Sequence, residues 1–123
     1  MHNGSSTAAR DVPLDLPALE ARCLGKLDLV ERVLQTFNEQ LDADLEKLEQ
    51  ALAADDVATF AQVAHRIKGM SANTEAHQIA REAAIAEQKA REKVMGDLPQ
   101  HVQRLKADRA RFAAAFELRS RAT

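Results

Sequence analysis

Residues that form tight turns and cross-links are scarce in this sequence. The 123 residues include four glycines, three prolines and one cysteine. Between Gly25 and Gly96, Gly69 is the only glycine or proline, so the many tight turns of a β-sandwich or β-barrel cannot be made. The single cysteine, Cys23, excludes an intramolecular disulfide and a thiolate metal cluster within this chain. An all-β fold is therefore excluded, and a reducing compartment fits the sequence best.

Long apolar runs and a strong excess of one charge are also lacking. No apolar run approaches the roughly 20 residues that cross a bilayer, and residues 1–10 are polar rather than basic and then apolar. The formal net charge is −2, which argues against capture of nucleic acid or anionic membrane by clustered cations. We expect a cytoplasmic protein whose partner is a protein or a small molecule, with no nucleic-acid or membrane partner.

The composition that remains is typical of one globular domain. Hydrophobic residues make up 46% of the chain and charged residues 29%. This is too apolar and too near neutral for a disordered chain, and the length leaves no room for a second domain. We expect residues 1–12 to form a flexible N-terminal tail and residues 13–121 a single domain.

Apolar periodicity predicts helices throughout this domain. Apolar residues recur in alternating steps of three and four from Leu27 to Leu52, which indicates one long helix with a single apolar face. Short connections make successive helices antiparallel. We therefore predict an all-α fold, an antiparallel up-down four-helix bundle with a short N-terminal lid helix. The other predicted helices begin after Asp15, at Asp55 or Asp56, at Asn73 or Thr74, and after Gly96.

His65 breaks the pattern of the third predicted helix. At 100° per residue, Phe60, Val63 and Ile67 gather on one side of this helix and His65 points about 160° away. An exposed histidine is either an ordinary surface residue or a functional one. Its neighbours on the exposed face are small, where a solvated helix usually carries long polar side chains, and we expect this face to receive a docking partner. The small residues are Ala58, Ala61, Gly69 and Ala72.

Two further residues fit a phosphoryl carrier. Lys68 follows His65 by three positions, within reach of an anion attached to the imidazole. An imidazole nitrogen is nucleophilic near neutral pH, so it could hold a phosphoryl group beside that cation. Gly69 is costly within a helix and serves either as a helix C-cap or as clearance for an approaching partner.

The segment from Ala64 to Asn73, AHRIKGMSAN, resembles the signature of histidine-containing phosphotransfer domains. These are small four-helix bundles that pass phosphoryl groups along two-component phosphorelays. The resemblance implies that His65 is phosphorylated, that Lys68 stabilises the phosphate, and that Gly69 leaves room for a receiver domain. In the chemotaxis-kinase branch a glutamate orients the histidine through its Nδ1. Glu87 lies at the matching distance, although spacing alone fits an ordinary bundle-edge glutamate equally well.

The resemblance covers roughly residues 14–118 and departs from the family pattern at one turn. Thr74 and Glu75 stand where the family has an apolar residue followed by glycine. Because a hydroxyl and a carboxylate suit a helix N-terminus, we expect these two residues to begin the fourth helix. His77 and His101 have no partner at metal-ligand spacing and are expected on the surface.

The sequence therefore predicts a carrier that takes a phosphoryl group onto His65 from a kinase or a receiver-domain aspartate and passes it to a response-regulator receiver domain. Its partners would be that receiver domain and a histidine kinase or hybrid kinase. No Gly-rich phosphate loop is present, so we expect no kinase activity of its own, no cofactor and no metal site.

Two other functions compete with this prediction. The long apolar stripe from Leu27 to Leu52 would also suit a structural helical-bundle adaptor, which leaves the small-residue face unexplained. Residues 60–85 superficially resemble a helix-turn-helix DNA-binding unit. However, Ala64 and Gly69 are five positions apart instead of the usual four, and the second helix of that unit would be rich in glutamate.

Overall fold

The computed structural model describes residues 12–122 of the chain, with side-chain environments described through residue 116. The predicted flexible tail lies outside the described residues, except for Val12. Every regular element within residues 12–122 is helical. The helices are α2 (Leu16–Arg22), α3 (Leu27–Ala53), α4 (Val57–Asn73), α5 (His77–Arg91) and α6 (Leu98–Ala122).

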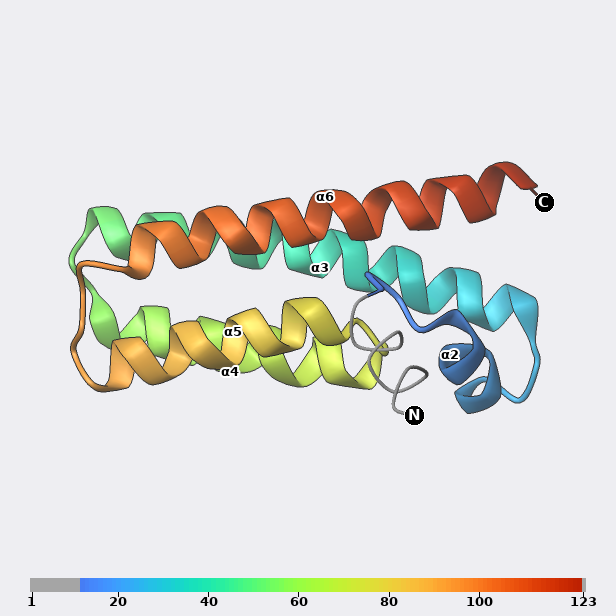
Figure 1. Cartoon of the computed structure of the whole chain (residues 1–123), viewed down its shortest axis with the longest axis horizontal. Coiled ribbons are helices and arrows are strands. Elements are labelled where there is room, and N and C mark those ends of the chain that lie inside the picture. Colours follow the sequence, from blue (N-terminus) through green and yellow to red (C-terminus); the bar gives the residue numbers. More distant parts are fainter. Residues whose placement is uncertain (1–11, 123) are drawn as a thin grey trace, which may run out of the picture.

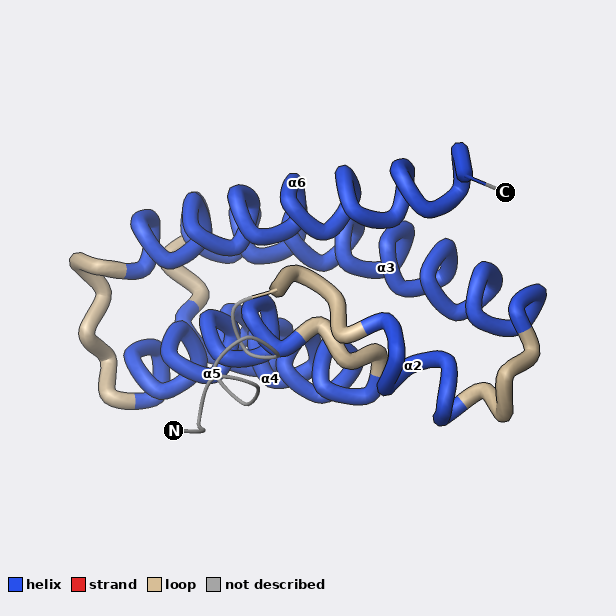
Figure 2. Tube along the Cα trace, turned by 45° about the vertical axis from the view of Figure 1, so that its right-hand side comes forward, coloured by secondary structure: helices blue, strands red, loops and turns tan. Residues whose placement is uncertain are grey.

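The four long helices form an up-down antiparallel bundle, which confirms the predicted fold. Helices α3 and α6 make one layer, and α4 and α5 make the other (Figure 1). Helix α4 packs against α3 and α5, and α6 packs against α5 and α3. The short α2 packs against α3 at one end of the bundle, as a lid (Figures 1 and 2). Because α4 and α5 run side by side, they do not form the steep crossing of a helix-turn-helix unit.

The core follows the predicted apolar faces. The stripe along α3 is buried from Val30 to Leu48, whereas Leu27 at its start is 56% exposed. Phe37 of this stripe meets Phe112 of α6 edge to face, with ring centroids 5.0 Å apart. The inward face of α5 is nearly all small, so α5 approaches α4 closely. That close approach brings side chains of α5 within reach of the exposed face of α4. The buried apolar residues of this α5 face are Ile79, Ala83, Ala86 and Ala90.

Two helix starts agree with the sequence. Asp15 caps α2 by accepting a hydrogen bond from the Ala18 amide at 3.2 Å. Asp56 caps α4 by accepting one from the Thr59 amide at 3.1 Å. Each carboxylate satisfies a backbone donor that has no partner within the helix.

The predicted start of the fourth helix is wrong. Helix α4 continues to Asn73, and α5 begins at His77 with Ala76 at the N-cap. The Thr74 hydroxyl donates to the Met70 carbonyl at 2.9 Å instead of capping α5. Glu75 adopts φ 65°, a left-handed conformation that glycine adopts without steric cost. This conformation explains why a glycine is usual at this turn of the family.

The other turns of the bundle also place non-glycine residues in the left-handed region, at Asp55 and Lys93. After each of these residues the next amide bonds back to a carbonyl of the last helical turn, for example the Asp56 amide to the Ala51 carbonyl at 2.9 Å. This is a Schellman-type ending, which satisfies carbonyls that a helix end leaves free. A glycine-poor sequence can therefore still connect its helices by tight turns.

Candidate functional site

His65 lies in the middle of α4 and faces away from the core. Its side chain is 61% exposed, while Phe60, Ala64 and Ile67 of the same helix are buried. The exposure predicted from the helical pattern is therefore found. An imidazole at this place is open to a reactant that approaches from solvent.

Glu87 of α5 reaches across to the His65 ring. The Oε2 atom of Glu87 lies 3.1 Å from His65 Nδ1, and the glutamate side chain is only 9% exposed. The same carboxylate accepts a hydrogen bond from Arg91 Nε at 2.8 Å and contacts Lys68 Nζ at 3.1 Å. The fold therefore brings His65, Lys68 and Glu87 together, as the resemblance to phosphotransfer domains implied.

The charge state of Glu87 determines which nitrogen of the neutral imidazole carries the proton. Burial raises the pKa of Glu87, but the hydrogen bonds from Arg91, Lys68 and His65 outweigh it and lower the pKa to about 2. Glu87 is thus a carboxylate at neutral pH, and a carboxylate only accepts hydrogen bonds. The neutral His65 ring must therefore carry its proton on Nδ1, which leaves the lone pair on Nε2.

Lys68 is already engaged in an ion pair. The sequence predicted that this lysine could reach an anion attached to the imidazole. In the structure, its Nζ forms an ion pair with Oε1 of Glu87. Lys68 and His65 thus share one carboxylate, each using a different oxygen. The lysine is held beside the ring, and its side chain is still partly exposed.

The face around His65 is open, with one exception to the prediction. Ala58, Gly69 and Ala72 are exposed, and a Cβ added at Gly69 would meet no atom within 4 Å. Gly69 lies inside α4, so the C-cap alternative for it is excluded. Ala61 is only 4% exposed, so the prediction that it lies on the exposed face with His65 is wrong. Because α4 packs on α5 as well as on α3, its buried arc extends beyond its large apolar residues.

Sequence reasoning missed a buried ion pair beside the site. Asp44 of α3 is completely buried and takes two hydrogen bonds from Arg66, from Nε at 3.1 Å and from NH2 at 2.6 Å. Gln40 adds a third, at 3.2 Å. Because Arg66 adjoins His65, the pair fixes this part of α4 against α3. Asp44 lies three residues after Leu41, on the apolar face of α3. An acidic residue at such a position could have indicated a buried ion pair.

The surface prediction for His101 is wrong. This residue is 5% exposed, and its Nδ1 lies 2.5 Å from Oε2 of Glu82 across the α5–α6 contact. A histidine that has no potential partner at metal-ligand spacing in the sequence can still pair with a residue of a neighbouring helix.

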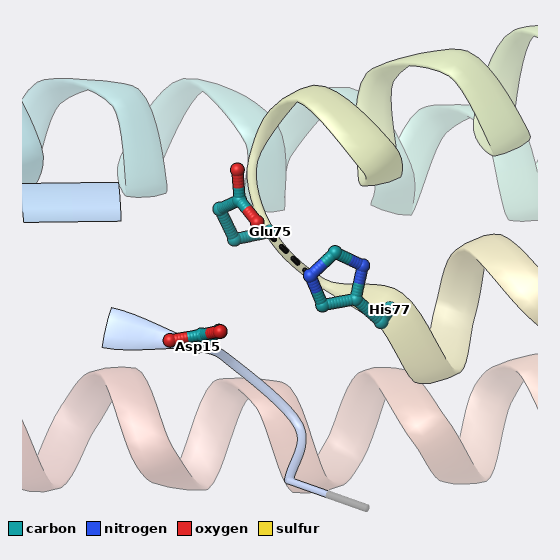
Figure 3. Close-up of side chains that lie close together, drawn as sticks. All are labelled: Asp15, Glu75 and His77. Atoms are coloured by element: carbon teal, nitrogen blue, oxygen red, sulfur yellow. Dashed lines mark hydrogen bonds and ion pairs between the residues drawn. The ribbon is translucent and has the colours of Figure 1, made fainter. Parts of the chain in front are cut away.

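His77 belongs to a second polar cluster, at the α4–α5 turn. Its Nε2 lies 2.9 Å from Oε1 of Glu75, and Asp15 of the lid segment lies close to both (Figure 3). His77 is half-buried, so the cluster is reached from solvent at the lid end of the bundle.

Comparison with known families decides what kind of protein carries this geometry. Residues 32–115 match the family model of the Hpt domain. The chain belongs to the Hpt domain family. Hpt domains are phosphotransfer carriers of two-component phosphorelays, so this chain has a phosphorelay carrier role.

Two relatives place this Hpt domain among known proteins. The chain is 36% identical over 69 residues to sensor protein EvgS of Escherichia coli strain K12, a match that spans 56% of this chain and 6% of EvgS. The crystal structure of histidine-containing phosphotransfer protein B from Pseudomonas aeruginosa PAO1 superposes with a TM-score of 0.84. That match covers 90% of this chain and 96% of the other at 24% identity, and it supports the fold.

Among the described residues, no helix has both the length and the apolar character needed to span a membrane.

Proposed function

We propose that His65 is the phosphorylated residue of this Hpt domain, with Nε2 as the acceptor atom. The observation that carries the proposal is the hydrogen bond from His65 Nδ1 to the ionised Glu87. It leaves the nucleophilic lone pair on Nε2 of a largely exposed ring. Neither a structural adaptor nor a DNA-binding unit has a use for such an imidazole.

The proposed reaction is exchange between an imidazole and an aspartyl phosphate. Nε2 attacks phosphorus, an N–P bond forms, the acyl phosphate O–P bond breaks, and the receiver aspartate leaves as a carboxylate. The ring then carries positive charge, which the Glu87 carboxylate stabilises through Nδ1–H. Transfer to the next receiver is the same step in reverse, with an aspartate oxygen attacking phosphorus and Nε2 leaving.

Lys68 has a separate part in this proposal. Its ammonium group lies beside the ring, on the carboxylate that also holds the ring. A flexible lysine can turn from that carboxylate toward the negative oxygens of the transferring phosphoryl group. We assign it to stabilising those oxygens, whereas Glu87 orients the imidazole.

The partner is proposed to dock on the exposed face of α4 that contains Ala58, Gly69 and Ala72. These short side chains let a receiver bring its aspartate in line with His65. A groove of about 380 Å³ between α3 and α4 borders this face at Met70 and Asn73 and offers further apolar contact. We place the exchange in the cytoplasm, with a histidine kinase or hybrid kinase upstream that supplies the chemistry on ATP.

Label transfer from a phosphorylated receiver domain tests the proposal. We expect the chain to take up radiolabelled phosphate that is labile in acid and stable in alkali, as phosphohistidine is. His65→Gln should take up none while keeping its helicity and melting temperature, since an exposed side chain contributes little packing. The matched control His2→Gln should be labelled like the wild type. Labelling of the His65→Gln variant would overturn the assignment.

A further inference from the structure

Three metal-ligating side chains meet where the lid joins the bundle. Asp15 precedes α2, Glu75 lies in the α4–α5 turn, and His77 is the first residue of α5. Each offers one ligand atom, and these three atoms all lie within 4.8 Å of one another (Figure 3). Asp15 lies 60 positions before Glu75 and 62 before His77, so spacing along the chain did not reveal the cluster.

The backbone holds these residues in place. The Asp15 amide donates to the Glu75 carbonyl at 3.0 Å, which ties the lid segment directly to the turn. Zinc bonds of about 2.0–2.2 Å in a tetrahedral site place ligand atoms roughly 3.4 Å apart. The His77 and Glu75 atoms are 2.9 Å apart, and the largest separation in the cluster is within 4.8 Å. Small side-chain rotations would therefore bring all three onto one ion.

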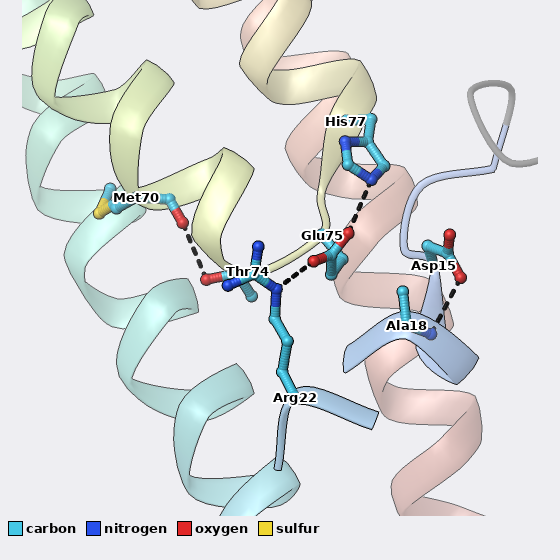
Figure 4. Close-up of polar contacts among 7 residues, drawn as sticks. All are labelled: Asp15, Ala18, Arg22, Met70, Thr74, Glu75 and His77. Carbon is cyan, nitrogen blue, oxygen red and sulfur yellow. Dashed lines mark hydrogen bonds and ion pairs between the residues drawn. The ribbon is translucent and has the colours of Figure 1, made fainter. Parts of the chain in front are cut away.

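The charges of the cluster favour a cation. Arg22 of α2 pairs with Oε2 of Glu75, while Oε1 of the same carboxylate faces His77 (Figure 4). Asp15 uses Oδ1 to accept from the Ala18 amide and keeps its second oxygen. With a neutral imidazole, two carboxylates and one guanidinium leave one negative charge in excess. A nitrogen ligand with two carboxylates suits zinc-type ions rather than Mg²⁺ or Ca²⁺, which prefer oxygen ligands.

We propose that Asp15, Glu75 and His77 bind a divalent transition-metal ion of the zinc type, with water completing its coordination. The ion fastens the lid helix α2 to the α4–α5 turn. This site is separate from His65, and the proposal stands or falls independently of the phosphotransfer function. It also departs from the sequence-based expectation of no metal site.

Zinc titration of the full chain tests the site. We expect calorimetry with ZnCl₂ to give one ion per chain, and zinc at about ten times its Kd to raise the Tm by roughly 5 °C. EDTA should reverse this shift. NMR spectra of the histidine rings should show zinc-dependent changes at His77 and none at His65.

Two variants test the ligand set. Asp15→Asn keeps an N-cap acceptor for α2 but removes the ligand charge, and His77→Gln removes the nitrogen ligand. Each should raise the Kd for zinc at least tenfold, with zinc-free melting as the check on folding. The matched controls His65→Gln and His2→Gln should bind zinc like the wild type. The proposal is overturned if the wild type binds no zinc, or if either Asp15→Asn or His77→Gln leaves the affinity unchanged.

Discussion

The hydrogen bond between His65 and Glu87 determines which ring nitrogen carries the proton. A histidine on a solvated helix would exchange freely between its two neutral tautomers. Here an ionised carboxylate accepts from Nδ1 at 3.1 Å, so one tautomer is favoured before any partner arrives. Because Lys68 holds the other oxygen of Glu87, the proposed nucleophile and the proposed phosphate-binding cation are positioned by a single side chain.

Replacing Lys68 tests its proposed part. We expect Lys68→Ala to slow transfer from a phosphorylated receiver by about 10- to 100-fold without abolishing it, because His65 remains while one cation is lost. Rapid-quench labelling at saturating and subsaturating donor measures the rate. Lys47→Ala, which removes an exposed lysine of α3, is the matched control. A Lys68→Ala rate equal to that of wild type at both donor concentrations would exclude Lys68 from the reaction.

The sequence was sufficient to predict the site residues that lie together on one helix. It was not sufficient to predict which residues of other helices contact them. His65 and Lys68 lie one helical turn apart, so their proximity follows from helix geometry alone. Whether Glu87 reaches the His65 ring depends on how closely α5 packs on α4. The separation of the two residues along the sequence does not determine this distance. Arg91 and Asp44 were missed for the same reason, since their partners are set by tertiary packing.

At the scale of helices, Glu87 joins α4 to α5 in a way that depends on pH. Its folded-state pKa is about 2, lowered from an ordinary value of 4.5. A lowered pKa means that the ionised form is favoured by folding. The stabilisation is therefore fully present above about pH 4.5 and is lost as the pH falls toward 2.

Urea unfolding over this pH range tests the α4–α5 connection. We expect Glu87→Gln to be less stable than wild type by on the order of 1–3 kcal/mol at pH 7, and the difference to shrink toward zero near pH 2. Glu46→Gln, which removes an exposed carboxylate of α3, should differ little from wild type at any pH. A Glu87→Gln difference that stays constant from pH 7 to pH 2.5 would contradict the stabilising role of the ionised carboxylate.

Arg66 and Asp44 join α4 to α3 on the opposite flank of the site. Arg66→Ala should lower the free energy of unfolding by about 1–3 kcal/mol, because the fully buried Asp44 carboxylate loses the guanidinium that pairs with it and keeps only the hydrogen bond from Gln40 among these contacts. The partial exposure of Arg66 keeps this loss below that of a fully buried pair. Thermal and urea unfolding measure it, with Arg104→Ala on exposed α6 surface as the control. Equal stability of Arg66→Ala and wild type would contradict this role.

Helix boundaries were predictable where the N-cap side chain has no competing hydrogen-bonding role. Asp15 and Asp56 precede apolar stripes and cap them, as expected. Thr74 suits a helix N-cap equally well in sequence, but α4 continues past Gly69 and the threonine hydroxyl bonds back to it. The turn that follows requires a left-handed backbone conformation at Glu75. A glutamate side chain gives no sign of this conformation in the sequence.

At the scale of the whole molecule, the bundle itself follows from apolar periodicity, whereas the exact exposed surface does not. A long stripe on α3 can be buried only against other long helices, which fixes the architecture. How far burial extends around each helix depends on its neighbours. Ala61 and His101 were both expected at the surface, and packing against α5 buries each of them. The proposed docking face is consequently narrower than the sequence implied and is centred on Gly69 and Ala72.

Filling this narrower face separates partner docking from the chemistry at His65. Gly69→Arg should fold, because Gly69 is helical, a Cβ meets nothing within 4 Å, and arginine has the higher helix propensity. Reacting atoms must approach to roughly 3–3.5 Å, so a guanidinium at this position should block a receiver domain and leave access to small molecules. We expect exchange with the receiver to fall at least 100-fold, while labelling by phosphoramidate or acetyl phosphate stays near wild type.

The matched control for this substitution is Ala110→Arg, which adds the same side chain to an exposed position of α6, in the layer opposite α4 (Figure 1). It should leave both the receiver reaction and the small-donor reaction unchanged. Melting curves of both variants show whether the fold is kept. If Gly69→Arg melts like wild type and still exchanges phosphate with the receiver at the wild-type rate, the partner approaches His65 from another side. The face of α4 around Gly69 would then have no part in docking.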